Sequence, residues 1–337
     1  SSGVPGSVFR LSAVKVDFSG GLALHGALAV LPSRPVHNSV DASGNFVLTA
    51  YNHPSNITVH CINADGTVGA EVPHGAKLDL GIFAHQVVMT PGGKSALMVT
   101  RGNNASKTKP EDPGALKIYR FDNGVLSPLA SIAPGGKGGL GYGPRHVDFH
   151  PTKPWMYASI ERQNTLHMHT LEGDSVSAEP KFCKTTLAEA KHEGLPRQMC
   201  SAIHVHPNGK FVYIANRCDH RIEHNGEKVF DAGENNIAVY AIDQNTGEPT
   251  LIQHVDAQTY HIRTFSLDPS GRMLVAASIN DMRVRVGAQV INVPAAMSVY
   301  RVGEDGKLSF ARKYNVKVPT EPKGKAQFWT GMITFAG

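Results

Sequence analysis

The sequence has few cysteines and no long hydrophobic run, and each shortage excludes a class of protein. Its four cysteines form no CxxC pair, so neither a disulfide framework nor a zinc ribbon is indicated. No stretch approaches the roughly 18 consecutive apolar residues of a membrane helix, and residues 1–7 lack the charged start of a signal peptide. We therefore expect a globular protein with reduced thiols, no membrane partner and a cytoplasmic location.

Charge is also scarce. Only 18% of the 337 residues are charged, and 33 basic residues against 28 acidic ones give a net charge of +5. No dense Lys/Arg run with interleaved aromatic residues is present, so the sequence indicates no nucleic-acid partner and only a modest preference for small anions. A hydrophobic content of 41% is enough for a large core and argues against disorder.

A unit of two hairpins occurs five times. The first hairpin has a Pro/Gly/Ser/Asn turn between alternating apolar residues, as in "VMTPGGKSALMVTRG", and the second bends at Asp-Gly, Asn-Gly or Asn-Thr-Gly, as in "GALKIYRFDNGVLS". Repeated four-stranded antiparallel sheets of this length predict an all-β fold, a β-propeller, in which residues 1–337 form a single domain. The equivalent first-turn residues, called anchors below, are Ala42, Pro91, Pro151, Pro207 and Pro269.

The ends of the chain do not complete a ring of such sheets. Residues 7–28 are typical of the second half of a blade, residues 326–335 ("AQFWTGMITF") of one isolated inner strand, and residues 1–7 of a vector-derived or flexible start. We expect either six blades with an irregular closing blade or about a blade and a half of chain upstream of Ser1.

Polar residues recur at fixed distances from the anchors. A hairpin that folds about its turn brings a residue six positions before the anchor opposite one nine or ten positions after it, at the end of the inner strands that surrounds a propeller channel. Turn chemistry demands no charge at these positions. The positions six and five before the anchor and ten after it hold His37, His85, Arg101, Arg145, His146, Glu161, Arg217 and Arg263.

This set suits an anionic substrate. Arginine stays charged and presents a planar donor fork to a carboxylate, a phosphate or an oxyanion. Glu161 with a neighbouring histidine supplies an acid–base partner. The register therefore predicts a cation-lined site at the channel mouth with one carboxylate in it.

The stretches "GPRHVDFHP" with "ASIE", "AIHVHPNGKFVYIANR" and "HIRTFSLDPSGRMLVAAS" resemble the propeller-type 6-phosphogluconolactonases and their relatives, the carboxy-cis,cis-muconate cyclases. The resemblance implies seven blades, about 75–80 residues before Ser1 and, by local motif, His85, Arg145, Glu161 and Arg217 as the catalytic residues. We expect substrate binding by His37, Arg101, His146, His204 and Arg263, with no cofactor and no metal.

Three functions remain open at this stage. The first is hydrolysis of an anionic, sugar-acid lactone, in which the arginines hold the substrate and Glu161 or His85 activates water. The second is a muconate-type cycloisomerase acting on an unsaturated dicarboxylate with the same residues. The third is a binding propeller without catalysis, because fold does not determine function.

Several weaker signals accompany these. Residues 134–143 ("PGGKGGLGYG") lack the GK[ST] ending of a phosphate-binding loop and are typical of a flexible connection. Pairs of histidines two apart, at 167 and 169 and at 204 and 206, share a strand face that a metal could use, although no third ligand is evident. Cys200 and Cys218 are expected near one hairpin mouth. Long connections at 101–114, 217–236 and 280–295 are expected to be surface loops that shape a pocket.

Overall fold

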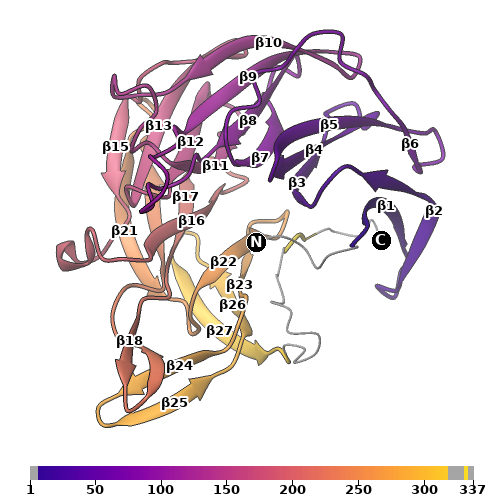
Figure 1. Cartoon of the computed structure of the whole chain (residues 1–337). Coiled ribbons are helices and arrows are strands. Elements are labelled where there is room, and N and C mark those ends of the chain that lie inside the picture. The colour runs from indigo at the N-terminus through magenta and orange to yellow at the C-terminus, as the bar shows by residue number, and fades with distance from the viewer. Residues whose placement is uncertain (1–6, 318–329, 333–337) are drawn as a thin grey trace. The chain divides into compact units, whose positions relative to one another are not determined.

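The computed structural model describes residues 7–317 and 330–332, whose regular secondary structure is almost entirely β-strand (Figure 1). The chain divides into two compact units: unit 1 comprises residues 1–145 and 171–179, and unit 2 comprises residues 146–170 and 180–337. The expectations for residues 1–6 and for most of the strand at 326–335 lie outside the described residues. Within the described ranges, no helix has the length and apolar character needed to cross a bilayer.

Unit 1 contains two complete antiparallel sheets and one hairpin. The hairpin pairs β1 (Phe9–Val16) with β2 (Leu22–Leu31), which confirms the half-blade predicted there. Leu48, Val59, Val87 and Met98 are fully buried between the two sheets, as the alternation in the sequence requires. The sheets are ordered β3 (Pro35–Val40), β4 (Phe46–Asn52), β5 (Ser55–Ile62), β6 (Val68–Glu71), and β7 (Ala84–Met89), β8 (Ser95–Thr100), β9 (Ala115–Asp122), β10 (Val125–Ile132).

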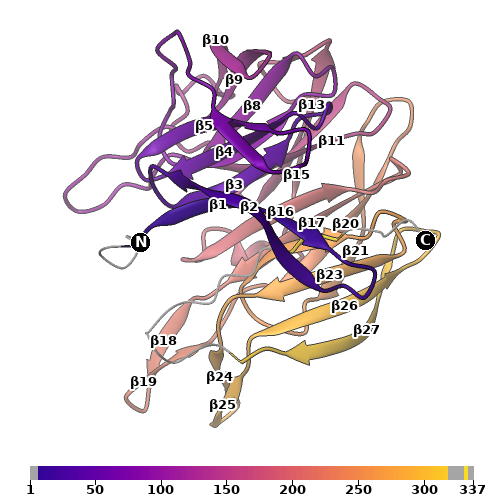
Figure 2. The ribbon, with the colours of Figure 1, turned by 90° about the vertical axis from the view of Figure 1, so that its right-hand side faces the viewer.

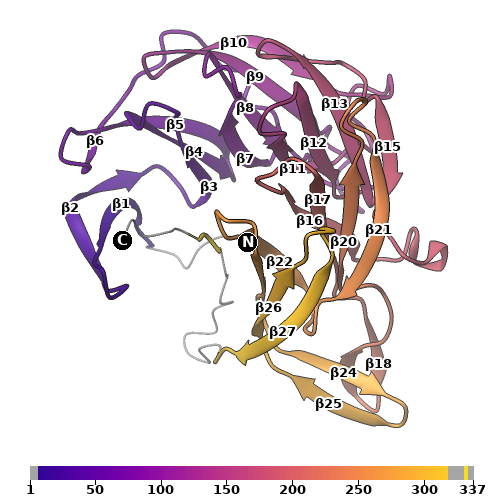
Figure 3. The same ribbon diagram turned by 180° about the vertical axis from the view of Figure 1, so that it is seen from behind.

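Unit 2 continues the pattern with two further four-stranded sheets, which are labelled in Figures 2 and 3. Tyr213, Phe265 and Tyr300 are fully buried in the core between them. The prediction of repeated four-stranded antiparallel sheets is thus confirmed. The sheets are ordered β16 (Gln198–Val205), β17 (Phe211–Cys218), β20 (Asn236–Ile242), β21 (Pro249–Asp256), and β22 (Ile262–Leu267), β23 (Met273–Ser278), β26 (Ala296–Val302), β27 (Leu308–Asn315).

The third repeat departs from the expected pattern at its outer strand. It contains β11 (Pro144–Phe149), β12 (Trp155–Ile160) and β13 (Thr165–Glu172), and the sequence places its fourth strand directly after the "EGD" turn. Only two residues, β14 (Ser175–Val176), pair there, opposite Leu171 and Glu172. The longer partner of β13 is β15 (Phe182–Thr185), which follows Pro180 and pairs with Thr165–Met168.

Side chains at equivalent positions join consecutive sheets of unit 2. His150 and His206, each directly before its anchor proline, place Nε2 2.8 and 2.9 Å from the backbone oxygens of Gly209 and Gly271 in the next first-hairpin turn. Their Nδ1 atoms accept backbone N–H groups of their own turns, so Nε2 carries the proton and donates. The "HP" dipeptides of the sequence therefore form contacts between sheets as well as turns.

Two of the connections expected to be loops form a sheet of their own. β18 (Arg221–His224) and β19 (Glu227–Phe230) form one hairpin, and β24 (Met282–Val286) and β25 (Gln289–Val293) form another. The two hairpins pair in parallel at Phe230 and Val284, and Figure 1 shows this sheet projecting beyond strands β22 and β26. The loop expectation was wrong because Asn225 and Gly226 both take positive φ angles, 51° and 81°, which makes a tight hairpin turn.

Backbone irregularities occur at the same position of the first hairpins. The residues skipped by the pairing are Val36 between β3 and β4, His85 between β7 and β8, and Arg263 between β22 and β23, each six positions before its anchor. Between β16 and β17 the irregularity spans Ser201 and Ala202. A bulge bends the strand and re-aims its side chains, so the position six before the anchor is one where strand pairing is interrupted in these hairpins.

Candidate functional site

The four predicted catalytic residues are divided between the two units. His85 in β7 and Arg145 belong to unit 1, whereas Glu161 and Arg217 belong to unit 2. The structure brings Glu161 and Arg217 together. Convergence of the whole predicted set at one opening stays a prediction.

Glu161 and Arg217 form a buried ion pair. Glu161 directly follows β12 and Arg217 is the penultimate residue of β17, so the ends of two neighbouring inner strands supply the pair. Arg217 Nη2 donates to Glu161 Oε2 at 3.1 Å, and the side chains are only 5% and 2% exposed, respectively. Removing two charges from water costs free energy, and the end of a β-strand can form without a buried ion pair. A retained pair of this kind is typical of a site that uses the charges.

Arg217 still has donors that these contacts do not use. Its Nη1 lies 2.9 Å from Nε2 of His261, and its Nη2 also lies 3.9 Å from the sulfur of Met199. Its Nε is buried and has no hydrogen-bond partner among the described residues. Because a guanidinium carries five N–H donors, Arg217 can bind a further acceptor while it holds Glu161.

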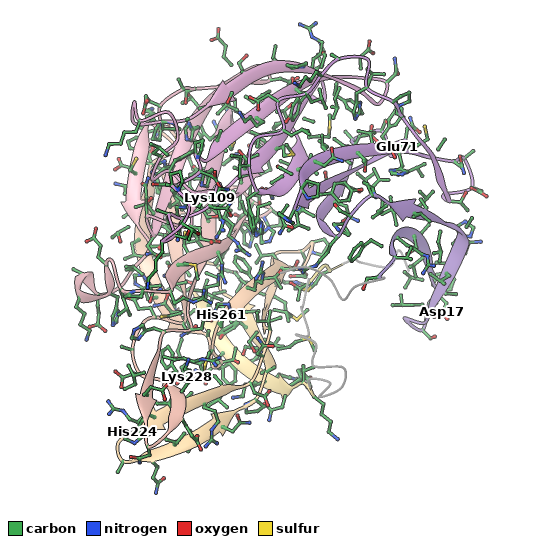
Figure 4. The ribbon with its side chains drawn as sticks, viewed as in Figure 1. Asp17, Glu71, Lys109, His224, Lys228 and His261 are labelled. Carbon is green, nitrogen blue, oxygen red and sulfur yellow. The ribbon has the colours of Figure 1, made fainter. Side chains whose placement is uncertain are left out.

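His261 and Asp219 are functional candidates that the register reasoning missed. His261 precedes β22, is 6% exposed and adopts a left-handed backbone with φ of 56°. Its Nδ1 faces Asp219 Oδ1 at 3.7 Å, and Asp219 in turn accepts two hydrogen bonds from Arg197, at 2.7 and 2.6 Å. Figure 4 labels His261 near the start of β22, whereas His224 and Lys228 mark the β18–β19 hairpin.

One signal for His261 was present in the sequence. It lies eight positions before its anchor, and the equivalent residues Phe83 and Gly143 also have positive φ angles, 61° and 56°. The position eight before the anchor lies two residues from that of Arg263, so the register places His261 at the same strand end. Asp219 gave no such signal because it lies beyond β17, in the connection predicted to be a loop.

The charge state of His261 follows from its surroundings. Burial lowers the pKa of its imidazole well below the usual range, the guanidinium of Arg217 lowers it further, and the carboxylate of Asp219 opposes both. The pKa of Asp219 is lowered in spite of its burial, because Arg197, His261 and Arg217 favour the carboxylate. At neutral pH the site therefore contains an uncharged imidazole between an arginine and an aspartate.

The unit 1 candidates lie in or directly after inner strands. His85 and Arg145 are both 1% exposed, and His37 lies in β3 and is partly buried. Arg101 directly follows β8 and places its guanidinium 4.3 Å from the centre of the Phe83 ring. A deeply buried guanidinium such as that of Arg145 is typical of an anion site or an ion-pair network.

In unit 2, His146 is buried and Arg263 partly buried at the bulged strand end, as the register predicts.

The structure does not bring His204 to the Glu161–Arg217 pair. His204 pairs with Tyr213, four residues from Arg217 along β17, which corresponds to about 13 Å of strand. Its Nδ1 lies 3.5 Å from Asp148, and its ring packs edge-on against Phe265. Its assignment to substrate binding stays a prediction, at a position three residues before its anchor.

The histidine pairs and the cysteines have other roles. His206 donates from Nε2 to the Gly271 carbonyl and accepts the Asn208 N–H at Nδ1, and within the described ranges no group of three His, Cys, Asp or Glu could hold a metal ion. Cys200 and Cys218 are buried and form no disulfide, and burial raises the pKa of Cys218 to about 11, which makes it a poor nucleophile at neutral pH.

Comparison with known proteins places these features in a family. The sequence profile described as "Lactonase, 7-bladed beta-propeller" matches residues 4–289. The 6-phosphogluconolactonase of Bacillus subtilis strain 168 is 29% identical over 253 residues, which cover 72% of this chain and 63% of that protein. The chain thus spans slightly less than two thirds of that relative's length.

Solved structures show the same fold. A crystal structure of a protein from Lactobacillus plantarum aligns with a TM-score of 0.69 at 22% identity, covering 94% of this chain and 81% of that one. The periplasmic gluconolactonase of Pseudomonas aeruginosa aligns with a TM-score of 0.63 at 18% identity, covering 93% and 79%. These similarities agree with the repeated four-stranded sheets and confirm the propeller prediction.

Proposed function

The chain belongs to the seven-bladed β-propeller lactonase family, and on this premise we propose that it hydrolyses an anionic sugar-acid lactone at a site centred on Glu161 and Arg217. The observation that carries the proposal is their buried ion pair, which combines a carboxylate base with a cation that keeps unused donors. The name of the Bacillus relative, 6-phosphogluconolactonase, supports lactone hydrolysis as the reaction.

Anionic substrates fit the cation content of the site. Arg217 and Arg263 lie at the ends of the inner strands of unit 2, and Arg145 and Arg101 have equivalent register positions in unit 1. A phosphate or carboxylate on the substrate would be held by bidentate guanidinium contacts, which bind planar oxyanions better than lysine does. We assign the substrate-binding role to these arginines with His37 and His146.

The reaction is the addition of water to the lactone carbonyl. Glu161 takes a proton from the water as its oxygen bonds to the carbonyl carbon, and the carbonyl oxygen becomes an oxyanion. Arg217 stabilises that oxyanion with its unused N–H donors, a contribution of about 3–4 kcal/mol for a well-placed donor. The oxyanion then re-forms the carbonyl, the ring C–O bond breaks, and the leaving oxygen takes the proton from Glu161. The product is a hydroxy acid that ionises to its carboxylate.

His85 would have a separate role in proton transfer. Its imidazole would take up or pass on the proton carried by Glu161, as the register and the family motif both suggest. His85→Ala therefore distinguishes a shared acid–base pair from a single base. Glu161 is the stronger candidate for the base because it contacts Arg217 directly.

The test is hydrolysis of 6-phosphoglucono-δ-lactone and glucono-δ-lactone, followed by proton release at constant pH. We expect Glu161→Gln to lower kcat/KM by about 100-fold or more, the usual range for loss of a general base. Glu223→Gln is the matched control, because Glu223 lies on exposed β18 and its side chain is 64% exposed. That control should retain the wild-type rate.

Other outcomes contradict the proposal. If Glu161→Gln and His85→Ala each keep the rate within about threefold of wild type, the base assignment is wrong. If neither lactone is hydrolysed but the ultraviolet absorbance of a muconate changes, the protein is a cycloisomerase. If both assays are silent with intact protein, the binding propeller is the remaining function.

A further inference from the structure

Five side chains of unit 2 form a row that ends at the proposed base, with one arginine–carboxylate pair on each side of a histidine. Arg197 holds Asp219, Asp219 faces His261, His261 contacts Arg217, and Arg217 holds Glu161. The row crosses three consecutive repeats, because its members adjoin β12, β16, β17 and β22. His261 is the uncharged group in its middle, and its chemistry determines how Arg217 is held.

The contact with Arg217 fixes the tautomer of His261. A guanidinium can only donate, so Nε2 of His261, 2.9 Å from Arg217 Nη1, must be an acceptor. An imidazole whose Nε2 accepts is neutral and has its proton on Nδ1. That Nδ1 faces the Asp219 carboxylate at 3.7 Å, too far for a direct hydrogen bond but close enough to favour a proton on this nitrogen.

The charged groups around His261 favour its neutral form. The guanidiniums of Arg217, Arg263 and Arg197 disfavour a protonated imidazole, whereas the carboxylate of Asp219 favours one. A protonated ring would place two N–H donors against each other at the Arg217 contact. The arrangement is therefore self-consistent only with an uncharged ring.

The backbone holds the ring in place. The His261 N–H donates to Asn235 Oδ1 at 2.6 Å. The same oxygen accepts the Cys218 N–H at 3.1 Å, and Asn235 Nδ2 donates to the Cys218 carbonyl at 3.2 Å. One amide side chain thus ties His261 to the residue that follows Arg217. The left-handed φ of 56° at His261 is a constrained conformation that such contacts maintain.

We propose that His261 is a positioning residue, a neutral Nδ1–H tautomer that fixes the plane of the Arg217 guanidinium beside Glu161, and that Asp219 adds to the preference for this tautomer. The proposal deepens the lactonase function and rests on it for its kinetic consequence. Two acceptors at different nitrogens, Glu161 at Nη2 and His261 at Nη1, define the orientation of the guanidinium. The directions of its remaining donors are then fixed as well.

The first experiment is nitrogen NMR of the intact protein with ¹⁵N-labelled histidine, in which the His261 resonances are assigned by their loss in His261→Gln. The expected result at pH 7 is a neutral ring with protonated Nδ1 and unprotonated Nε2. An imidazolium, or a proton on Nε2, overturns the proposal. This readout requires no activity, so it stands even if the lactonase assays fail.

The second experiment separates positioning from folding. His261→Leu removes the acceptor and should lower kcat by about 100-fold with little change in KM, the cost of misplacing a catalytic group by about 1 Å. His261→Gln restores an acceptor oxygen and should recover most of that loss. His224→Leu, at the end of β18, is the control and should have the wild-type kcat.

The kinetics of the His261 variants decide between a positioning role and a structural one. Recovery by His261→Gln supports positioning, and equal kcat values for the Leu and Gln variants with unchanged thermal unfolding overturn it. If His261→Leu does not fold, Asp219→Asn provides the second test through the NMR signal. Loss of the Nδ1–H preference in that variant supports the role of Asp219, and an unchanged signal overturns that role.

Discussion

At the scale of single residues, buried polar side chains have two different roles in this protein. In the row from Arg197 to Glu161, charged groups are paired but donors remain for a ligand. At Glu234, which is 6% exposed, all contacts are internal: its oxygens accept from the Ala188 and Glu189 backbones, from Asn236 and from His192, at 2.8–2.9 Å. The first arrangement is suited to chemistry, the second to holding the chain around β16 and β20.

Glu234 yields a prediction about acid stability. Burial alone would raise the pKa of this carboxyl, but the hydrogen bonds from Ala188, His192, Glu189 and Asn236 outweigh it and lower the pKa. A lowered pKa in the folded state means that the stabilisation is complete above the pKa of the unfolded chain and is lost as the pH falls through the folded value. Glu234→Gln should reduce the free energy of unfolding by about 2–3 kcal/mol at pH 7.

Urea unfolding of the wild type and the variant at several pH values measures this effect. The difference between the two proteins should shrink as the pH is lowered below 4. A difference of the same size at pH 7 and pH 3 would show that the charge of Glu234 does not matter.

At the scale of elements, the first-hairpin turns link one sheet of unit 2 to the next. The His150 ring bridges its own turn and the Gly209 carbonyl, and a Cβ at Gly209 would approach that ring to 2.5 Å. Gly209 also has a φ of 71°, so both space and backbone require glycine. The "HP…G" spacing of the sequence therefore reports a contact between repeats.

His150→Leu tests this contact between repeats. The substitution leaves the Gly209 carbonyl and two backbone N–H groups without the ring, and it should lower the free energy of unfolding by about 1–3 kcal/mol at pH 7.5. Burial lowers the pKa of His150, against the hydrogen bond to Gly209, so the folded protein keeps the ring neutral. Its contribution is present above about pH 6.5 and is lost as the pH falls through the lower folded value.

Chemical denaturation at pH 7.5 and pH 5 provides the measurement, with His224→Leu as the control. The loss caused by His150→Leu should be smaller at pH 5. A variant as stable as wild type at both pH values would show that the turns do not join the sheets through this ring.

At the scale of the whole molecule, the repeat pattern was readable because each first hairpin carries its own turn at Pro91, Pro151, Pro207 or Pro269. The Glu161–Arg217 pair was readable for the same reason, since equal distances from two anchors imply one strand end. The β18–β25 sheet was not, because its strands are short and its parallel contact joins segments about 50 residues apart. The position of His261 follows from its register, eight residues before its anchor, but its role depends on a left-handed backbone and on Asn235, which periodicity does not report.

The most direct test of the account is a double-mutant cycle at Glu161 and Arg217 with 6-phosphoglucono-δ-lactone as substrate. If the two side chains act as one catalytic unit, Glu161→Gln and Arg217→Met should each lower kcat/KM by about 100-fold or more, and the double variant should be little worse than either. Losses that multiply would show two independent roles. Wild-type rates in all three variants would contradict the assignment of this buried pair as the catalytic centre.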